Sequence, residues 1–257
     1  MSSSLTPSAD PHILYEIDQA LFIITINRVE KKNALTGTMY RALADGLRQA
    51  DANPKVRVIM IRGADDCFTS GNDVNDFQKP RSDNEERPSV YFMKTISRTS
   101  KPVIAAISGL AIGIGTTLLL HCDLVYASEQ CFLQLPFTRL GICPEAGSSL
   151  LLPEIIGHQR ASELLLLGDR FSARKALEYG MVNEVLPQSE YLAFALAKAH
   201  ELASLPGDAI VTSKRLIKRR LENVLPATIE EELKEFGRLL KSPEAQAIVA
   251  AFLNRKK

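Results

Sequence analysis

The chain has 257 residues, of which 46% are hydrophobic and 24% are charged, and its formal net charge is +1 at pH 7. This composition is that of a globular protein with a sizeable core, and the near-neutral charge gives no basic field for nucleic acid or a membrane surface. The four cysteines lack CxxC spacing and the four histidines lack HExxH spacing, so we expect free thiols in a reducing cytoplasm and no metal site.

The first half of the chain is rich in predicted strands. A polar segment over 1–11 predicts a mobile tail, and 13–17 and 21–27 alternate apolar residues around a short polar turn, which predicts a hairpin. Residues 35–50 have apolar side chains at helical spacing and end before AsnPro. Short apolar runs predict buried strands at 56–61, 103–107 and 124–127.

Residues 103–120 are uncharged over nearly the length of a short transmembrane helix, and Gly109 and Gly113 form a GxxxG pattern. However, three glycines interrupt the run, so a buried strand, a glycine turn and a buried helix fit it better than a membrane span. The polar segment 72–88 predicts a surface excursion that forms a wall of the site.

From residue 191 onward the apolar spacing predicts helices, over 191–203, 208–221, 227–240 and 243–253. The resulting architecture is an α/β core over 12–190 followed by a helical region over 191–257. A basic run in the second of these helices is interpreted as a solvated helix face rather than a phosphate site. Its members are Lys214, Arg215, Lys218, Arg219 and Arg220.

Two glycine-rich turns and one acid are the most informative feature of the chain. The turns are CFTSGND at 67–73 and GLAIGIGTT at 109–117, and the acid lies in GICPEAGSS at 141–149. Neither turn has the third glycine of a dinucleotide fingerprint, and no GxxxxGK loop is present in the sequence, which argues against nicotinamide or ATP. Two turns that aim backbone N–H groups at one point, together with one carboxylate, are instead the minimum set for enolate chemistry.

Six motifs in order resemble the crotonase (enoyl-CoA hydratase/isomerase) superfamily over nearly the whole chain. They are NRVEKKNAL at 27–35, CFTSGNDV at 67–74, KPVIAAISG at 101–109, HCDL at 121–124, FSARKALEYGMVN at 171–183 and SPEAQ at 242–246. The resemblance implies an α/β fold with a crotonase-like ββα spiral core and a C-terminal helical region. It also implies an acyl-CoA substrate in fatty acid metabolism, no cofactor beyond the coenzyme A of that substrate, and a homotrimer or dimer of trimers.

By resemblance, the oxyanion hole consists of the backbone N–H groups of Ser70, beside Gly71, and of Ile114, beside Gly113. Glycines in such turns let the chain approach a thioester oxygen closely. The side chain of Ile114 occupies the family's usual glycine position, which is a departure from the family pattern.

The acids distinguish the reactions of the family. The two glutamates that family hydratases use to activate water correspond to Thr117 and Phe137, which cannot act as carboxylate bases. Glu145 instead resembles the catalytic glutamate of Δ3,Δ2-enoyl-CoA isomerases of the peroxisomal type. An apolar pocket of Leu135, Phe137 and Leu140 would raise the pKa of Glu145, whereas a following helix N-terminus would lower it, so the sequence leaves this direction open.

The resemblance further places Lys31 and Lys32 near the phosphates of coenzyme A and Phe236 beside the acyl or pantetheine channel. Asp73 and Asp123 occupy motif positions, but loop capping and buried hydrogen bonds explain both. Ser148 and Ser149 lack a GxSxG elbow and are not expected to be nucleophiles.

The leading hypothesis is therefore an isomerase that moves the double bond of a 3-enoyl-CoA to the 2-position, as in the β-oxidation of unsaturated chains. One alternative is a hydratase or another enolate-forming acyl-CoA enzyme. A second is a non-catalytic scaffold that binds coenzyme A esters, in which Glu145 only complements a helix dipole.

Overall fold

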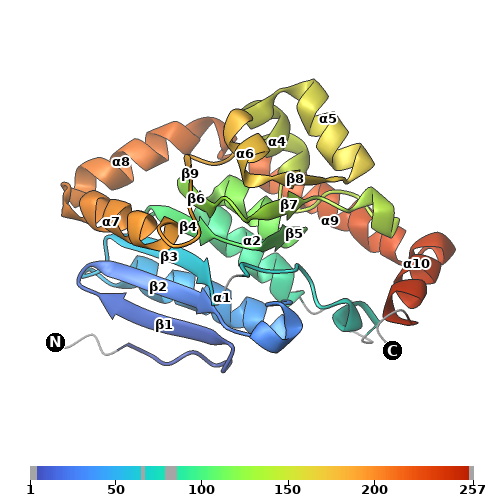
Figure 1. The fold of residues 1–257 in the computed structure, drawn as a ribbon, viewed down its shortest axis with the longest axis horizontal. Helices are drawn as coiled ribbons and strands as arrows, with labels where there is room; N and C mark the ends of the chain where they lie inside the picture. The colour runs from blue at the N-terminus through green and yellow to red at the C-terminus, as the bar shows by residue number, and fades with distance from the viewer. Residues whose placement is uncertain (1–4, 65–66, 79–85, 255–257) are drawn as a thin grey trace.

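The computed structural model describes residues 5–64, 67–78 and 86–254 (Figure 1). Strands form a six-stranded sheet in the order β1-β2-β3-β4-β6-β9 and a three-stranded sheet in the order β5-β7-β8. The larger sheet contains Ile13–Asp18 (β1), Leu21–Ile26 (β2), Val58–Gly63 (β3), Val103–Ile107 (β4), Leu124–Ser128 (β6) and Glu184–Leu186 (β9). The smaller contains Leu110–Ile112 (β5), Phe132–Gln134 (β7) and Arg170–Ser172 (β8).

The first two strands form the hairpin that the sequence predicts, with Ile13 opposite Ile26 and Asp18 opposite Leu21. All other pairs of the larger sheet are parallel. Every residue of β2 is buried, because its side chains alternate between two apolar layers. Parallel strands covered on both faces read as continuous apolar runs, as the sequence does at these positions.

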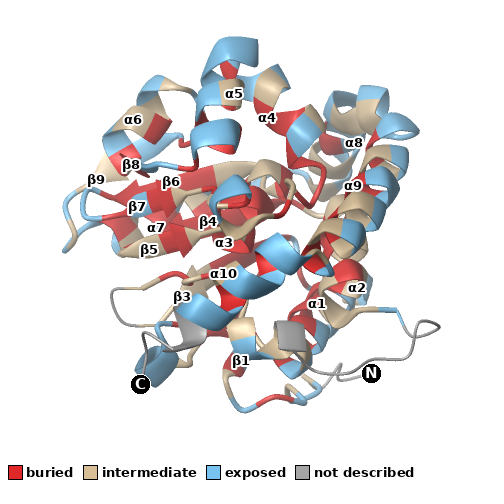
Figure 2. Ribbon diagram, turned by 90° about the vertical axis from the view of Figure 1, so that its right-hand side faces the viewer, coloured by how far each residue is buried: buried red, intermediate tan, exposed pale blue. Residues whose placement is uncertain are grey.

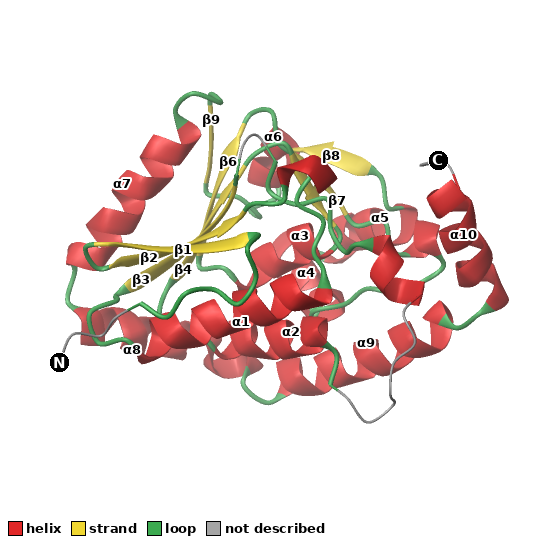
Figure 3. Cartoon of the chain, turned by 90° about the horizontal axis from the view of Figure 1, so that it is seen from below, coloured by secondary structure: helices red, strands yellow, loops and turns green. Residues whose placement is uncertain are grey.

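Helices cover both faces of the larger sheet, as the view from below shows (Figure 3). On one face lies α7 (Tyr191–Ser204), whose alanines pack on side chains such as Ile23 and Met60. On the other lie α1 (Gly37–Ala52) and α2 (Pro88–Arg98), which belong to the main core. The layered arrangement agrees with an α/β architecture.

The uncharged segment over 103–120 is not one helix. It contains β4 and β5, followed by α3 (Ile114–Thr117) and the 3₁₀ turn η3 (Leu118–His121). Gly113, with φ 57°, ends β5 and precedes α3. Within the described ranges, no helix has both the length and the apolar character needed to cross a membrane.

The middle of the chain adds three short helices. Two further 3₁₀ turns lie before α1 and after β7. The helices are α4 (Ser148–Ile156), α5 (His158–Leu167) and α6 (Ala173–Glu178). The turns are η1 (Val29–Lys31) and η4 (Thr138–Leu140). A further turn, η2 (Val74–Gln78), lies in the polar excursion predicted over 72–88. Residues 79–85 of that excursion and residues 1–4 of the predicted tail fall outside the described residues.

The C-terminal part is helical, as predicted, and its elements begin and end within a few residues of the expected bounds. After α7 come α8 (Gly207–Lys218), the turn η5 (Arg219–Leu221), α9 (Val224–Leu240) and α10 (Pro243–Asn254). Figure 2 shows buried residues gathered in the strands and α3, with exposed surfaces on the outer helices such as α5 and α8.

Candidate active site

The two glycine-rich turns pack directly against each other. A Cβ added to Gly71, which has φ 90°, would lie 2.7 Å from the carbonyl oxygen of Ile112, and one added to Gly115 would lie 2.6 Å from Cγ2 of Thr69. Only glycine tolerates such an approach together with a positive φ at Gly71. The sequence motifs at 67–73 and 109–117 therefore meet at one point, as predicted.

The free N–H donor of the first turn is not the one that the sequence analysis assigns. The N–H of Ser70 donates to the carbonyl oxygen of Lys32 at 3.0 Å, so this group is already engaged. Leu35 pairs with the turn as in a parallel ladder, bonding to the oxygen of Gly71 and to the N–H of Asp73. In such a ladder the intervening N–H, that of Asn72, faces the opposite side. It has no partner among the residues that the structure describes, and the available donor is therefore Asn72 rather than Ser70.

The second turn supplies the N–H of Ile114, the first residue of α3. The first N–H groups of a helix have no intrahelical acceptor, and that of Ile114 finds none elsewhere in the described part of the chain. The Ile114 side chain is 1% exposed and belongs to the main core, so it packs behind the turn.

Glu145 lies in a tight turn immediately before α4. The next two residues are left-handed, with φ 60° at Ala146 and 72° at Gly147, which is uncommon for a residue other than glycine. The Glu145 side chain is 3% exposed, and its Oε1 atom has no hydrogen-bond partner among the residues that the structure describes. The hydroxyl oxygens of Thr117 and Ser148 are the two other buried side-chain oxygens without a partner among the described residues.

Burial raises the pKa of the Glu145 carboxyl to about 8, because the charged form loses its hydration. The negative charge of Glu232 acts in the same direction, whereas the nearby Thr117 hydroxyl lowers the pKa. The direction that the sequence left open is thus set by desolvation. A carboxyl group with such a pKa can both accept and release a proton close to neutral pH.

Glu232 of α9 holds the turn from one side. Its Oε2 accepts a hydrogen bond from the N–H of Gly147 at 2.6 Å, and its Oε1 accepts from the N–H and the hydroxyl of Ser149 at 2.9 and 2.5 Å. A carboxylate that accepts the N–H groups at the start of α4 caps the helix and complements its dipole. The helix-dipole role considered for Glu145 in the sequence is therefore filled by Glu232.

His121 of η3 holds the same turn from the other side, through 2.7 Å between its Nε2 and the carbonyl oxygen of Ala146. A carbonyl only accepts, so Nε2 carries the proton. Burial lowers the pKa of His121 to about 4, assisted by the charges of Lys218 and Lys214 and opposed by this hydrogen bond. The imidazole is therefore neutral near pH 7 and acts as a fixed donor.

Tyr40 of α1 contacts the first turn and lies within electrostatic reach of the acid. Its hydroxyl donates to the side-chain oxygen of Asn72 at 2.5 Å. Burial raises the pKa of Tyr40 well above its usual value, and the charges of Glu145 and Asp76 add to the effect. The buried phenol thus contacts Asn72, and its pKa responds to the charge of Glu145.

The remaining site residues named by the sequence lie around this centre. Phe137, at the N-terminal end of η4, and Phe236, one turn after Glu232 on α9, are buried at 3% and 6% exposure. Lys31 and Lys32 are exposed beside the first turn, whose Ser70 contacts the backbone of Lys32.

Two acids of the motifs have structural partners. Asp73 forms an ion pair with Arg28 at 2.8 Å, and Asp123 pairs with Lys214 at 2.7 Å and accepts from the N–H of Val103. This corrects the interpretation of the basic run as a solvated face for one member, because Lys214 is only 7% exposed.

The sequence analysis missed three residues that form or support the candidate site: Asn72, His121 and Glu232. Only Glu232 left a clear signal. The buried positions of α9 are Leu225, Ile229, Glu232, Phe236 and Leu240, so an acid interrupts the apolar stripe of an amphipathic helix. A charge at such a position requires a buried partner, here the start of α4.

Comparisons with known proteins find similar chains. A family profile described as Enoyl-CoA hydratase/isomerase matches residues 16–257. Enoyl-CoA delta isomerase 2 of Rattus norvegicus is 34% identical over 250 residues, which cover 95% of the chain and 64% of that protein, so the chain spans less than two thirds of this relative. The 2,3-dehydroadipyl-CoA hydratase of Escherichia coli K12 is 30% identical, over 93% of the chain and 94% of the relative.

Solved structures give the same result. The structure of an enoyl-CoA hydratase/isomerase from Pseudoalteromonas atlantica T6c superposes with a TM-score of 0.92 and 38% identity, covering 95% of this chain and 97% of that one.

Proposed function

The chain belongs to the enoyl-CoA hydratase/isomerase family, and from this membership and the single unengaged acid at its centre we propose that it is a Δ3,Δ2-enoyl-CoA isomerase. The observation that carries the proposal is Glu145, a buried carboxyl with its pKa raised to about 8 and one oxygen without a partner. Double-bond migration needs one base that takes a proton from C2 and returns it at C4.

The proposed reaction begins with ionised Glu145. It removes the proton at C2 of a 3-enoyl-CoA, and the electrons pass into a dienolate whose oxygen accepts hydrogen bonds from the N–H groups of Asn72 and Ile114. Protonated Glu145 then delivers the same proton to C4, which leaves the double bond between C2 and C3 and restores the carboxylate. Such donors contribute most when they point at the developing charge, and removal of one typically costs about 10²- to 10³-fold in rate.

Water addition is disfavoured because it normally requires a second acid to position the water. Thr117 and Phe137 occupy the positions where the resemblance places those acids. The negative charge of Glu232 acts on Glu145, but three hydrogen bonds from Gly147 and Ser149 engage the Glu232 carboxylate. A carboxylate held in this way is poorly placed to exchange protons with a substrate.

We further propose that Lys31 and Lys32 meet the phosphates of coenzyme A, and that Phe137 and Phe236 line the acyl or pantetheine channel. The substrate belongs to the β-oxidation of unsaturated fatty acyl chains, and the protein assembles as a trimer or a dimer of trimers. Light scattering during size-exclusion chromatography tests the assembly, and a stable monomer would contradict it.

The decisive experiment mixes the purified protein with a 3-enoyl-CoA and follows the conjugated 2-enoyl-CoA, with hydration of a 2-enoyl-CoA as a second assay. Isomerisation should fall by about 10²-fold or more in Glu145→Gln. The matched control is Glu154→Gln on α4, which removes an acid that pairs with Arg220 at the surface and should leave the rate unchanged. Hydration faster than isomerisation would identify a hydratase instead. Binding of the esters without either reaction would identify a different enolate enzyme or a scaffold.

A further inference from the structure

A cavity lies behind the turn that carries Glu145, on the other side of His121. It has a volume of about 520 Å³ and opens between the end of α2, η3, the α8–η5 segment and the start of α9. Small-molecule sites typically have volumes of about 300 to 1,000 Å³. His121 lines this cavity and bonds to Ala146, so the imidazole separates it from the acid in the turn.

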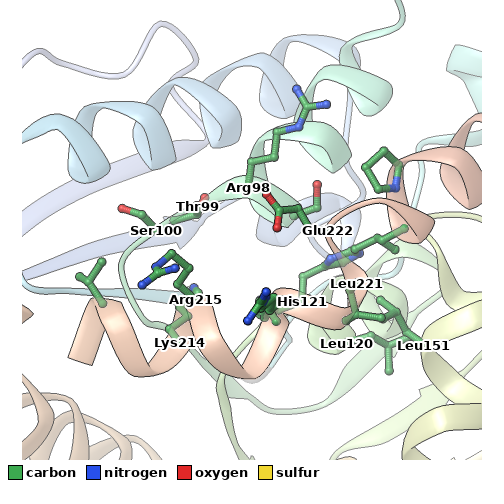
Figure 4. Close-up of a pocket in the computed structure, with 16 residues that line it drawn as sticks. Arg98, Thr99, Ser100, Leu120, His121, Leu151, Lys214, Arg215, Leu221 and Glu222 are labelled. Atoms are coloured by element: carbon green, nitrogen blue, oxygen red, sulfur yellow. The ribbon is translucent and has the colours of Figure 1, made fainter. Parts of the chain in front are cut away.

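One end of the cavity is polar and cationic. Figure 4 shows Arg215 and Lys214 beside Thr99 and Ser100 at this end. The ammonium group of Lys214 is engaged by Asp123 at 2.7 Å and by the carbonyl of Lys101 at 2.6 Å. The guanidinium group of Arg215, in contrast, has no hydrogen-bond or ion-pair partner among the described residues.

Basic residues outnumber acidic ones around this cavity. The lining includes Arg98, Lys214, Arg215, Lys218 and Arg219 but only one acid, Glu222. Asp123, just outside the lining, contacts both lysines, at 2.7 and 3.7 Å. The two carboxylates, Glu222 and Asp123, cannot neutralise two ammonium groups and three arginines, so the cavity attracts an anion.

The opposite end is apolar. Leu120, Leu151 and Leu221 gather there in Figure 4, on the far side of His121 from Arg215. Leu225 extends this surface and packs on the catalytic turn, since a Cβ added to Gly147 would lie 2.4 Å from its Cδ1 atom. An inorganic anion would leave these side chains uncovered, whereas an aliphatic chain would bury them.

We propose that this cavity is a binding site for a medium-chain carboxylate. The carboxylate lies against Arg215, whose planar guanidinium matches its two oxygens, and the aliphatic chain covers Leu120, Leu151 and Leu221. The site is distinct from the one that holds the acyl-CoA, and its occupancy does not depend on the proposed isomerase activity.

Isothermal titration of the intact protein with octanoate tests the proposal. Octanoate should bind saturably. The Arg215→Gln substitution should raise the dissociation constant of octanoate by about tenfold or more, because a charge-assisted hydrogen bond is lost. The matched control is Arg220→Gln, a neighbouring exposed arginine that does not line the cavity, which should bind octanoate like the unchanged protein. Leu221→Ser probes the apolar end. It should weaken the binding of octanoate more than it weakens the binding of inorganic phosphate.

Two further titrations separate the competing explanations. In saturating octanoyl-CoA, octanoate should still bind, whereas displacement would place it in the acyl-CoA site and overturn the proposal. If inorganic phosphate binds as tightly as octanoate, the cavity binds anions in general, and the proposed preference for a medium-chain carboxylate is wrong. Size-exclusion chromatography of Arg215→Gln should match that of the unchanged protein, and a change in assembly would identify this face as an interface between copies of the chain.

Discussion

Replacement of Glu145 by glutamine should stabilise the protein increasingly as the pH rises, while it lowers the rate of the proposed isomerisation by about 10²-fold or more. In the folded protein the pKa of Glu145 is about 8, and its ordinary value is 4.5. Between these two pH values the folded state keeps a proton that the unfolded chain has released. Above pH 8 Glu145 is ionised in both states, and the folded state is then destabilised by the full difference between the two pKa values. The wild-type free energy of unfolding therefore falls as the pH rises from 4.5 to 8, because the folded state binds more protons.

The size of the effect follows from the shift of about 3.5 pKa units, at 1.36 kcal/mol per unit. The ionisation penalty is about 1 to 2 kcal/mol at pH 5.5 and about 5 kcal/mol at pH 9. Glutamine has nearly the same shape and does not titrate, so its packing and its unsatisfied amide contribute equally at both pH values. The stability difference between Glu145→Gln and the wild type should thus grow by about 3 kcal/mol over this range.

Urea unfolding at pH 5.5 and pH 9 measures this difference directly from the midpoints and slopes. Glu154→Gln serves as the control, because its surface ion pair with Arg220 does not involve burial of the charge. A Glu145→Gln effect on stability that is the same at pH 5.5 and pH 9 would refute the reasoning, since it would place the pKa of Glu145 near its ordinary value.

Four other outcomes are expected. The kcat/KM for isomerisation should rise with a midpoint near pH 8, because only ionised Glu145 is a base; a rate that is flat from pH 7 to pH 9 argues against this. Glu232→Gln should move that midpoint to lower pH and reduce the rate by about tenfold or more, since it removes the neighbouring charge and loosens the turn; an unchanged pH profile counts against the role of Glu232. Gly71→Ala should destabilise the protein by about 1 to 3 kcal/mol in urea, because φ is 90° and a carbonyl lies 2.7 Å from the new Cβ. Lys214→Met should cost about 3 kcal/mol in the same assay, as Asp123 loses its buried partner, and a neutral result would show that water replaces it.

The sequence predicts the elements that depend on local periodicity. The hairpin of β1 and β2 and the buried strands β3, β4 and β6 follow from apolar runs with period two or with no polar interruption. The helix predicted from residue 35 begins at Gly37, because the hydroxyl of Thr36 accepts the N–H of Met39 and caps the helix there.

The assignment of the N–H donor in the first turn could not be made from local pattern. Whether Ser70 or Asn72 is free depends on which side of the turn faces Leu35 and on the bond from Ser70 to Lys32. A shift of one residue along an extended segment reverses the direction of its N–H, so only the tertiary pairing decides. The raised pKa of Glu145 likewise follows from burial by tertiary packing. The charge of Glu232 adds to it, and α9 brings that residue to the turn from some 85 residues further along the chain.

Hydrogen bonding gives the two neighbouring carboxyl groups different roles. Burial raises the pKa of Glu232, but the donors from Ser149 and Gly147 lower it again, and these bonds would weaken if Glu232 became protonated. Within the described part of the chain, Glu145 has no comparable donors, and its Oε1 atom has no partner. Of two acids that repel each other, the one with fewer donors takes up the proton first. We therefore propose that Glu145 is the group that exchanges protons, while Glu232 fixes the turn on which Glu145 lies.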